Sequence, residues 1–193
     1  MATHRAIVAT SETLRSMLEQ ACPRDEFPDA RFELFQASDF QRKLDEGISL
    51  FLYRVAVSTA RRNNPPRTSP DGRRLRPPLP VDLFYLCSAW GKSVARQHAL
   101  LGWAMRALED GNVLPSGVLN AAGAHDDTFR PGESVEVVHE PLSLQDLNAL
   151  WEVLRPEIPV SAGYVVRGVP IESTIPLPDA GPPVQTRSLE FGR

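Results

Sequence analysis

Two apolar stretches, GISLFLYRVAVST at residues 47–59 and LPVDLFYLCSAW at residues 79–90, decide how this chain folds. Each is long enough to cross a whole domain as a strand, and each carries apolar side chains on both of its alternating faces. Strands of this kind lie in the middle of a sheet that is covered on both sides. We therefore expect both stretches to be central strands of one core.

The segment that joins these strands lacks helical periodicity, so it predicts an antiparallel pair rather than a parallel pair with a crossover helix. Elsewhere the pattern predicts helices at residues 2–22, 92–110 and 141–156, shorter strands at 30–40, 135–140 and 158–173, and a turn-rich stretch at 112–134. The connections between neighbouring strands are of different kinds. This favours the α+β class, with a mixed, mostly antiparallel sheet and packed helices.

Residues spaced by three and four positions define the face that each helix is expected to bury. The three faces are Ile7, Leu14, Met17, Leu18 and Ala21; Val94, His98, Leu101, Met105 and Leu108; and Leu144, Leu147, Trp151 and Leu154. His98 is accordingly expected to be a half-buried structural histidine. Ser143 is expected to cap the last helix, with Asp146 in its first turn.

A chain of 193 residues fits one domain. We expect a single α+β domain at residues 1–175 and an extended, proline-rich C-terminal arm at residues 176–193, because the arm has too little apolar patterning for a core element. No apolar run approaches a membrane span, and the N-terminus lacks a signal pattern, so synthesis and assembly in the cytosol are expected.

The sequence contains no recognisable catalytic motif. No phosphate-binding glycine loop, nucleophile elbow or zinc-binding pattern occurs. Ligand-type side chains gather at His125, Asp126, Asp127, His139 and Glu140, but their spacing matches no defined metal or acid–base geometry. We expect no enzyme, no cofactor and no metal. Cys22 and Cys87 are expected to be buried, reduced thiols.

The stretch RRNNPPRTSPDGRRLRPP at residues 61–78 carries six arginines and one acidic residue in a chain of net charge −3. It is a solvated hairpin loop, a protein-docking loop or a nucleic-acid-binding loop. It contains no aromatic residue for base stacking, which argues against nucleic-acid binding. The candidate docking residues are Arg61, Arg62, Arg67, Arg73, Arg74 and Arg76, since arginine is favoured at protein interfaces.

Several stretches, taken in order, resemble the tail-terminator or cap proteins of phage-tail-like contractile injection systems, typified by the antifeeding prophage and the Photorhabdus virulence cassettes. The stretches are GISLFLYRV, RNNPPR, RPPLPVDLFYLCSAW, QHALLGWAMRALED, LSLQDLNALWEVL and IPVSAGYVVRGVPIES. The resemblance covers roughly residues 3–175. Some relatives are longer at the C-terminus.

The resemblance implies a structural cap. Such proteins form a six-fold ring at the end distal to the baseplate, which stops tube and sheath polymerisation and joins the two. The implied partners are further copies of this chain, the sheath protein and the inner tube protein, within an intracellular or released particle. We expect the C-terminal arm to dock on a neighbour through strand addition. The candidate docking residues there are Ile175, Leu177, Val184, Leu189 and Phe191. A nucleic-acid-binding module using the Arg61–Arg76 loop is the alternative.

Overall fold

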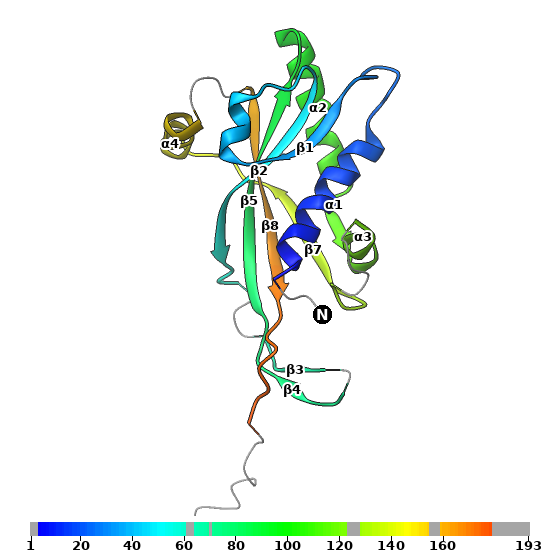
Figure 1. Ribbon diagram of the computed structural model, residues 1–193, viewed down its shortest axis with the longest axis vertical. Coiled ribbons are helices and arrows are strands. Elements are labelled where there is room, and N and C mark those ends of the chain that lie inside the picture. Colours follow the sequence, from blue (N-terminus) through cyan, green and yellow to red (C-terminus); the bar gives the residue numbers. More distant parts are fainter. Residues whose placement is uncertain (1–3, 61–63, 70, 123–127, 155–158, 179–193) are drawn as a thin grey trace, which may run out of the picture.

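The computed structural model describes residues 4–60, 64–69, 71–122, 128–154 and 159–178. A six-stranded sheet runs through the domain (Figure 1). Its strand order is β1 (Arg31–Phe35), β2 (Gly47–Val57), β5 (Leu79–Trp90), β8 (Ser161–Ile171), β7 (Ser134–His139) and β6 (Val113–Pro115). Only β1 and β2 are parallel, and every other neighbouring pair is antiparallel. The predicted α+β class, with a mixed and mostly antiparallel sheet, is confirmed.

The two decisive stretches are β2 and β5, which pair antiparallel as expected, with Leu50 opposite Cys87. Alternate residues of β5 face opposite cores. Leu83, Tyr85 and Cys87 belong to the larger cluster, whereas Leu86 belongs to the smaller one. This alternation explains why the strand is apolar on both faces.

Three helices cover one face of the sheet: α1 (Ala6–Ala21), α2 (Val94–Asp110) and α3 (Ser116–Ala122) (Figure 1). The side chain of Tyr85 is fully buried beneath them, and its hydroxyl is 2.7 Å from Oγ of Ser11 on α1. This hydrogen bond satisfies the polar end of the largest fully buried side chain among the described residues. The side chains between these helices and the sheet form the main core of the domain.

The opposite face is covered over part of its length only. There the 3₁₀ helix η1 (Ala37–Gln41) and helix α4 (Leu144–Leu154) enclose a smaller apolar cluster around Phe40 and Trp90. The indole Nε1 of Trp90 donates to Oγ of Ser49 at 2.7 Å. The remainder of this face is open, so the second half of β2 departs from the two-sided cover that the sequence predicted.

Packing selects helix faces that differ from the predicted ones. On α2 the buried residues are Leu100, Leu101, Ala104 and Leu108, whereas Val94, His98 and Met105 are exposed. The small side chain of Ala104 allows α2 to approach the sheet closely. The longer side chain of Met105, on the predicted face, would hold the helix farther away. His98 is therefore not a half-buried structural histidine.

The other two helices differ from their predicted faces in similar ways. Small side chains extend the buried face of α1, and Ala21 is exposed. On α4, Leu144 is 79% exposed, and among the side chains that the structure describes only Leu154 is buried, with Leu150 packed against the smaller cluster. The side chain of Trp151 lies outside the described residues. The predicted cap is confirmed, since the Asp146 N–H donates to Oγ of Ser143 at 3.1 Å.

The predicted turn-rich stretch contains regular structure at residues 113–122, where β6 is followed by α3. Cys22 and Cys87 are both buried and free, as expected. Within the described parts of the chain, no helix combines the length and hydropathy needed to cross a membrane.

Candidate functional site

The middle of the arginine-rich stretch forms a hairpin. Strand β3 (Arg67–Thr68) pairs antiparallel with β4 (Arg74–Leu75). The turn is closed by the N–H of Ser69, which donates to the Arg73 carbonyl at 2.9 Å, and Gly72 supplies a φ of 83° that favours glycine. The hairpin also packs against the domain, since the side chain of Leu75 is buried.

Arg67 is an anchor of the hairpin rather than a free docking residue. Its Nη1 lies 2.7 Å from Oε1 of Glu172 and also contacts Glu133. Arg130 binds the same Glu172 carboxylate and donates to the Thr68 carbonyl at 3.0 Å. Only 2% of the Glu172 side chain is exposed. The charges of Arg67 and Arg130 are thus balanced by Glu133 and Glu172.

The chain that leaves β8 continues along the hairpin. The N–H of Arg76 donates to the Ile175 carbonyl at 3.1 Å, and the N–H of Leu177 donates to the Arg74 carbonyl at 2.8 Å. Residues 175–177 therefore lie alongside β4, with an isolated antiparallel bridge between Leu75 and Pro176. Figure 1 shows the β3–β4 hairpin, with the chain that follows β8 beside it, projecting from one end of the domain; we call this the projecting unit. The two predicted docking elements, loop and arm, are joined there into one structure.

The projecting unit leaves only part of its charge unpaired. The exposed side chain of Arg73 lies 3.2 Å from Asp71 of its own turn. Arg74 and Arg76 are exposed, and no carboxylate of the described residues lies within ion-pair distance of either. Ile175 beside them is 51% exposed. The remaining candidate docking residues, Arg61, Arg62, Val184, Leu189 and Phe191, lie outside the described residues.

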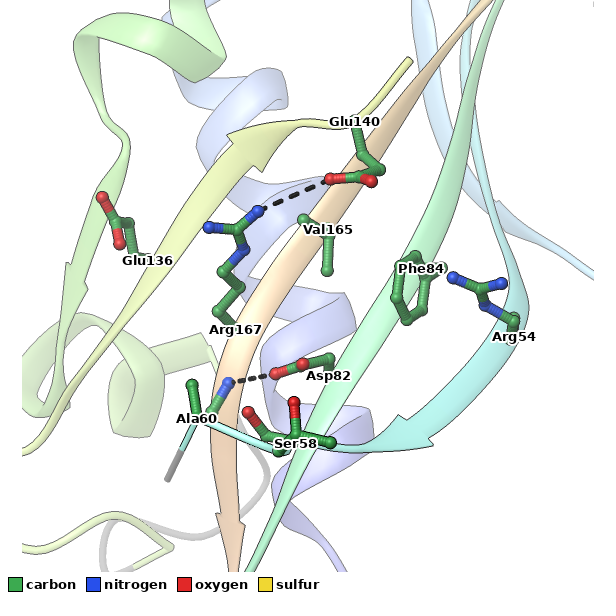
Figure 2. A pocket seen from close by; sticks show the side chains of 11 residues that line it. Arg54, Ser58, Ala60, Asp82, Phe84, Glu136, Glu140, Val165 and Arg167 are labelled. Atoms are coloured by element: carbon green, nitrogen blue, oxygen red, sulfur yellow. Dashed lines mark hydrogen bonds and ion pairs between the residues drawn. The ribbon is translucent and has the colours of Figure 1, made fainter. Parts of the chain in front are cut away.

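A second candidate surface is a hollow of about 460 Å³ on the open face of the sheet (Figure 2). A bulge in β2 forms one wall: Leu52 is opposite Tyr85 and Arg54 is opposite Phe84, so Tyr53 is an extra residue. The guanidinium carbon of Arg54 lies 3.8 Å from the centre of the Phe84 ring. This cation–π contact holds Arg54 against the sheet without neutralising its charge.

A second bulge, in β8, forms the opposite wall. Asp82 of β5 faces both Arg167 and Gly168, and Gly168 has a φ of 68° that favours glycine. The Gly168 N–H donates to the Asp82 carboxylate at 2.8 Å. Arg167 is thereby directed toward Glu140, at 3.5 Å, as Figure 2 shows. Sequence analysis missed this surface, although a glycine inside a strand pattern was a signal for a bulge.

The ligand-type residues singled out in the sequence are not brought together in the described structure. His125, Asp126 and Asp127 lie outside the described residues. His139 packs edge-on against Tyr164, with ring centroids 5.5 Å apart. Within the described ranges, no group of three or more His, Cys, Asp or Glu side chains is placed to hold a metal ion.

The fold is similar to that of two solved cap proteins. The first, a PVC sheath/tube terminator of an extracellular contractile injection system in its extended state, gives a TM-score of 0.62 at 21% identity over 100% of this chain. The second, the tube-terminating cap of the anti-feeding prophage, gives 0.60 at 18% identity over 94%. This chain spans 65% and 60% of the length of those proteins. The domain therefore has the α+β fold of the tail terminators.

The chain belongs to the family described as the Pvc16 N-terminal domain, whose sequence profile matches residues 9–186. The resemblance found in the sequence is thus confirmed over nearly the whole chain. A comparison with curated proteins finds no match.

Proposed function

We propose that this protein is a structural cap of a contractile injection system, which ends the growth of tube and sheath at the baseplate-distal end and joins the two. The observation that carries the proposal is the family match over residues 9–186, together with a fold shared with two cap proteins. The proposed role is non-enzymatic. Its partners are the sheath protein and the inner tube protein, in a particle assembled in the cytoplasm.

The proposed assembly is a homohexameric ring formed by the domain at residues 1–175, with residues 176–193 as an arm. A ring subunit must present two different surfaces to its neighbours, because head-to-tail contacts are what close a cyclic oligomer. The open sheet face, with its hollow beside β2, is the surface that we propose for one of these contacts.

Removal of the protein from a particle-producing strain tests the role directly. Particles without a cap should have tubes and sheaths of irregular length, measured by electron microscopy of purified particles. Restoring the full chain should restore a narrow length distribution. Normal, uniform particles in the absence of the protein would overturn the proposal.

Within that role, we propose that Arg74 and Arg76 dock the projecting unit on an acidic surface of sheath or tube. Both guanidinium groups are exposed and unpaired among the described residues, and an acidic partner would neutralise them. The variant Arg74→Ser/Arg76→Ser should fold normally and detach from particles at lower salt than the unaltered protein. Arg106→Ser, on the exposed side of α2, is a matched control that should leave attachment unchanged.

The arm is tested separately by truncation after Pro178, which retains the pairing of residues 175–177 with β4. The truncated protein should keep its thermal stability but give fewer capped particles. Normal capping by this variant would rule out a docking role for residues 179–193. The nucleic-acid alternative is not supported, since both structural neighbours are terminators of tube or sheath.

A further inference from the structure

One edge of the main sheet is only half covered. Strand β1 pairs with residues 47–51 of β2, and β2 continues for six more residues, Leu52–Val57. No described strand pairs with these six residues on the side away from β5. Their backbone groups therefore form a short open edge, which is a template for one additional strand.

The side chains along this edge are unlike those of a protected edge. Val55 is 46% exposed and Val57 is 41% exposed, whereas soluble proteins usually protect open edges with lysine or proline. Arg54, which lines the hollow, has no carboxylate partner among the described residues. The edge thus offers hydrogen bonds, two apolar contacts and one positive charge to an extended segment.

We propose that this edge, residues 52–57 of β2, accepts residues 184–191 of a second copy of the chain as an added strand. The sequence VQTRSLEF at 184–191 has no proline or glycine in eight residues and contains valine, threonine and phenylalanine, which favour strands. Its Glu190 supplies the negative charge that Arg54 lacks. The proposal deepens the docking role of the arm by naming its acceptor.

The reach of the chain explains why the donor is a second copy. Val57 lies opposite Val81, which lies opposite Val169, and Leu177 follows Val169 by eight residues. Eight extended residues span about 26 Å. Seven steps from Leu177 to residue 184 span at most about 25 Å, and the chain would also have to reverse direction. Residue 184 of the same chain therefore cannot reach the position beside Val57, which favours donation by a second copy.

Cross-linking of the full chain tests the proposal. One variant carries Val57→Cys and another carries Ser188→Cys; the native thiols of Cys22 and Cys87 are buried and should not compete. After mixing and mild oxidation, we expect a disulfide-linked dimer that contains one chain of each variant, identified by mass spectrometry of the linked peptides. The matched control is Val113→Cys, an exposed valine on the strand at the opposite end of the sheet.

A yield several-fold higher with Val57→Cys than with Val113→Cys supports the proposal, and equal yields overturn it. The double variant Val57→Cys/Ser188→Cys gives a second measurement: a link within one chain, seen as a fast-migrating monomer, contradicts donation by a second copy. Because the purified protein suffices, this outcome is separate from that of the particle experiments. Failure of the cross-linking test would exclude strand exchange between copies and would leave the proposed cap function untouched.

Discussion

Arg130 contacts both carboxylate oxygens of Glu172: Nη2 donates to Oε2 at 2.8 Å, and Nε lies 2.7 Å from Oε1 as an ion pair. The same carboxylate accepts from Arg67 of the hairpin at 2.7 Å. Glu172 follows the last strand of the main sheet, Arg130 precedes β7, and Arg67 opens the hairpin. One buried carboxylate therefore fixes the position of the projecting unit on the domain.

Replacement of Glu172 by glutamine should destabilise the protein by roughly 3 kcal/mol, because it leaves two partly buried guanidinium groups without their shared anion. Urea denaturation monitored by tryptophan fluorescence measures the change. Asp110→Asn removes a carboxylate from the fully exposed pair with Arg106 and should leave stability unchanged within error. Equal effects of the two variants would show that the buried network contributes no more to the free energy of unfolding than the exposed ion pair does.

Gly47→Ala should be severely destabilising, whereas the same change at Gly102 should be harmless. Gly47 has a φ of 152°, and a Cβ there would lie 2.0 Å from the carbonyl oxygen of Arg31 on the adjacent strand. β1 would have to move away from β2. At Gly102, on α2, a Cβ meets nothing within 4 Å, and alanine should stabilise the helix by about 0.5–1 kcal/mol. Thermal melts of both variants compare the two sites.

Tyr85→Phe should lower the free energy of unfolding by about 1–2 kcal/mol, because it removes the buried hydrogen bond to Ser11. Tyr53→Phe is the control. Tyr53 is half-buried against the smaller apolar cluster, and its hydroxyl forms no hydrogen bond with the described residues. An equally small change in the free energy of unfolding for Tyr85→Phe and Tyr53→Phe would contradict a stabilising role of the Tyr85–Ser11 hydrogen bond.

Stability should fall as the solution becomes alkaline. Burial raises the pKa of Cys87 from 9.0 to about 12, and burial is also the main cause that raises the pKa of Tyr164 from 10.0 to about 12. The unfolded chain therefore loses these protons before the folded chain does, so the stabilisation is complete below about pH 9 and is lost as pH rises toward 12. Urea midpoints across this range measure the decline.

Cys87→Ala isolates the contribution of the thiol. The variant should lose less stability than the parent between pH 9 and about 11, since it has one group fewer to ionise on unfolding. The native Cys87 thiol should also react with iodoacetamide only after unfolding, because it is fully buried and protonated. An unchanged pH profile together with rapid native alkylation would be inconsistent with the buried site.

The sequence by itself determined the sheet. The apolar stretches of β2 and β5 specify two neighbouring strands of the sheet, because apolar residues on both alternating faces favour a strand enclosed by two layers. The second half of β2 is the exception, since its residues are partly or fully exposed. The antiparallel pairing followed from the non-helical segment between them. The capped start of α4 followed from Ser143, since capping depends on residues three positions apart.

Only the tertiary structure decided which surfaces are exposed. The hairpin anchor at Arg67 depends on Glu133 and Glu172, which lie far from it in the sequence, and the hollow depends on bulges in two strands. The buried stripe of α2 depends on which side chains fit against the sheet. Periodicity and capping are local properties that a sequence carries directly. Ion pairing, bulge register and the open edge of β2 arise from contacts between distant segments, and these exist only once the chain has folded.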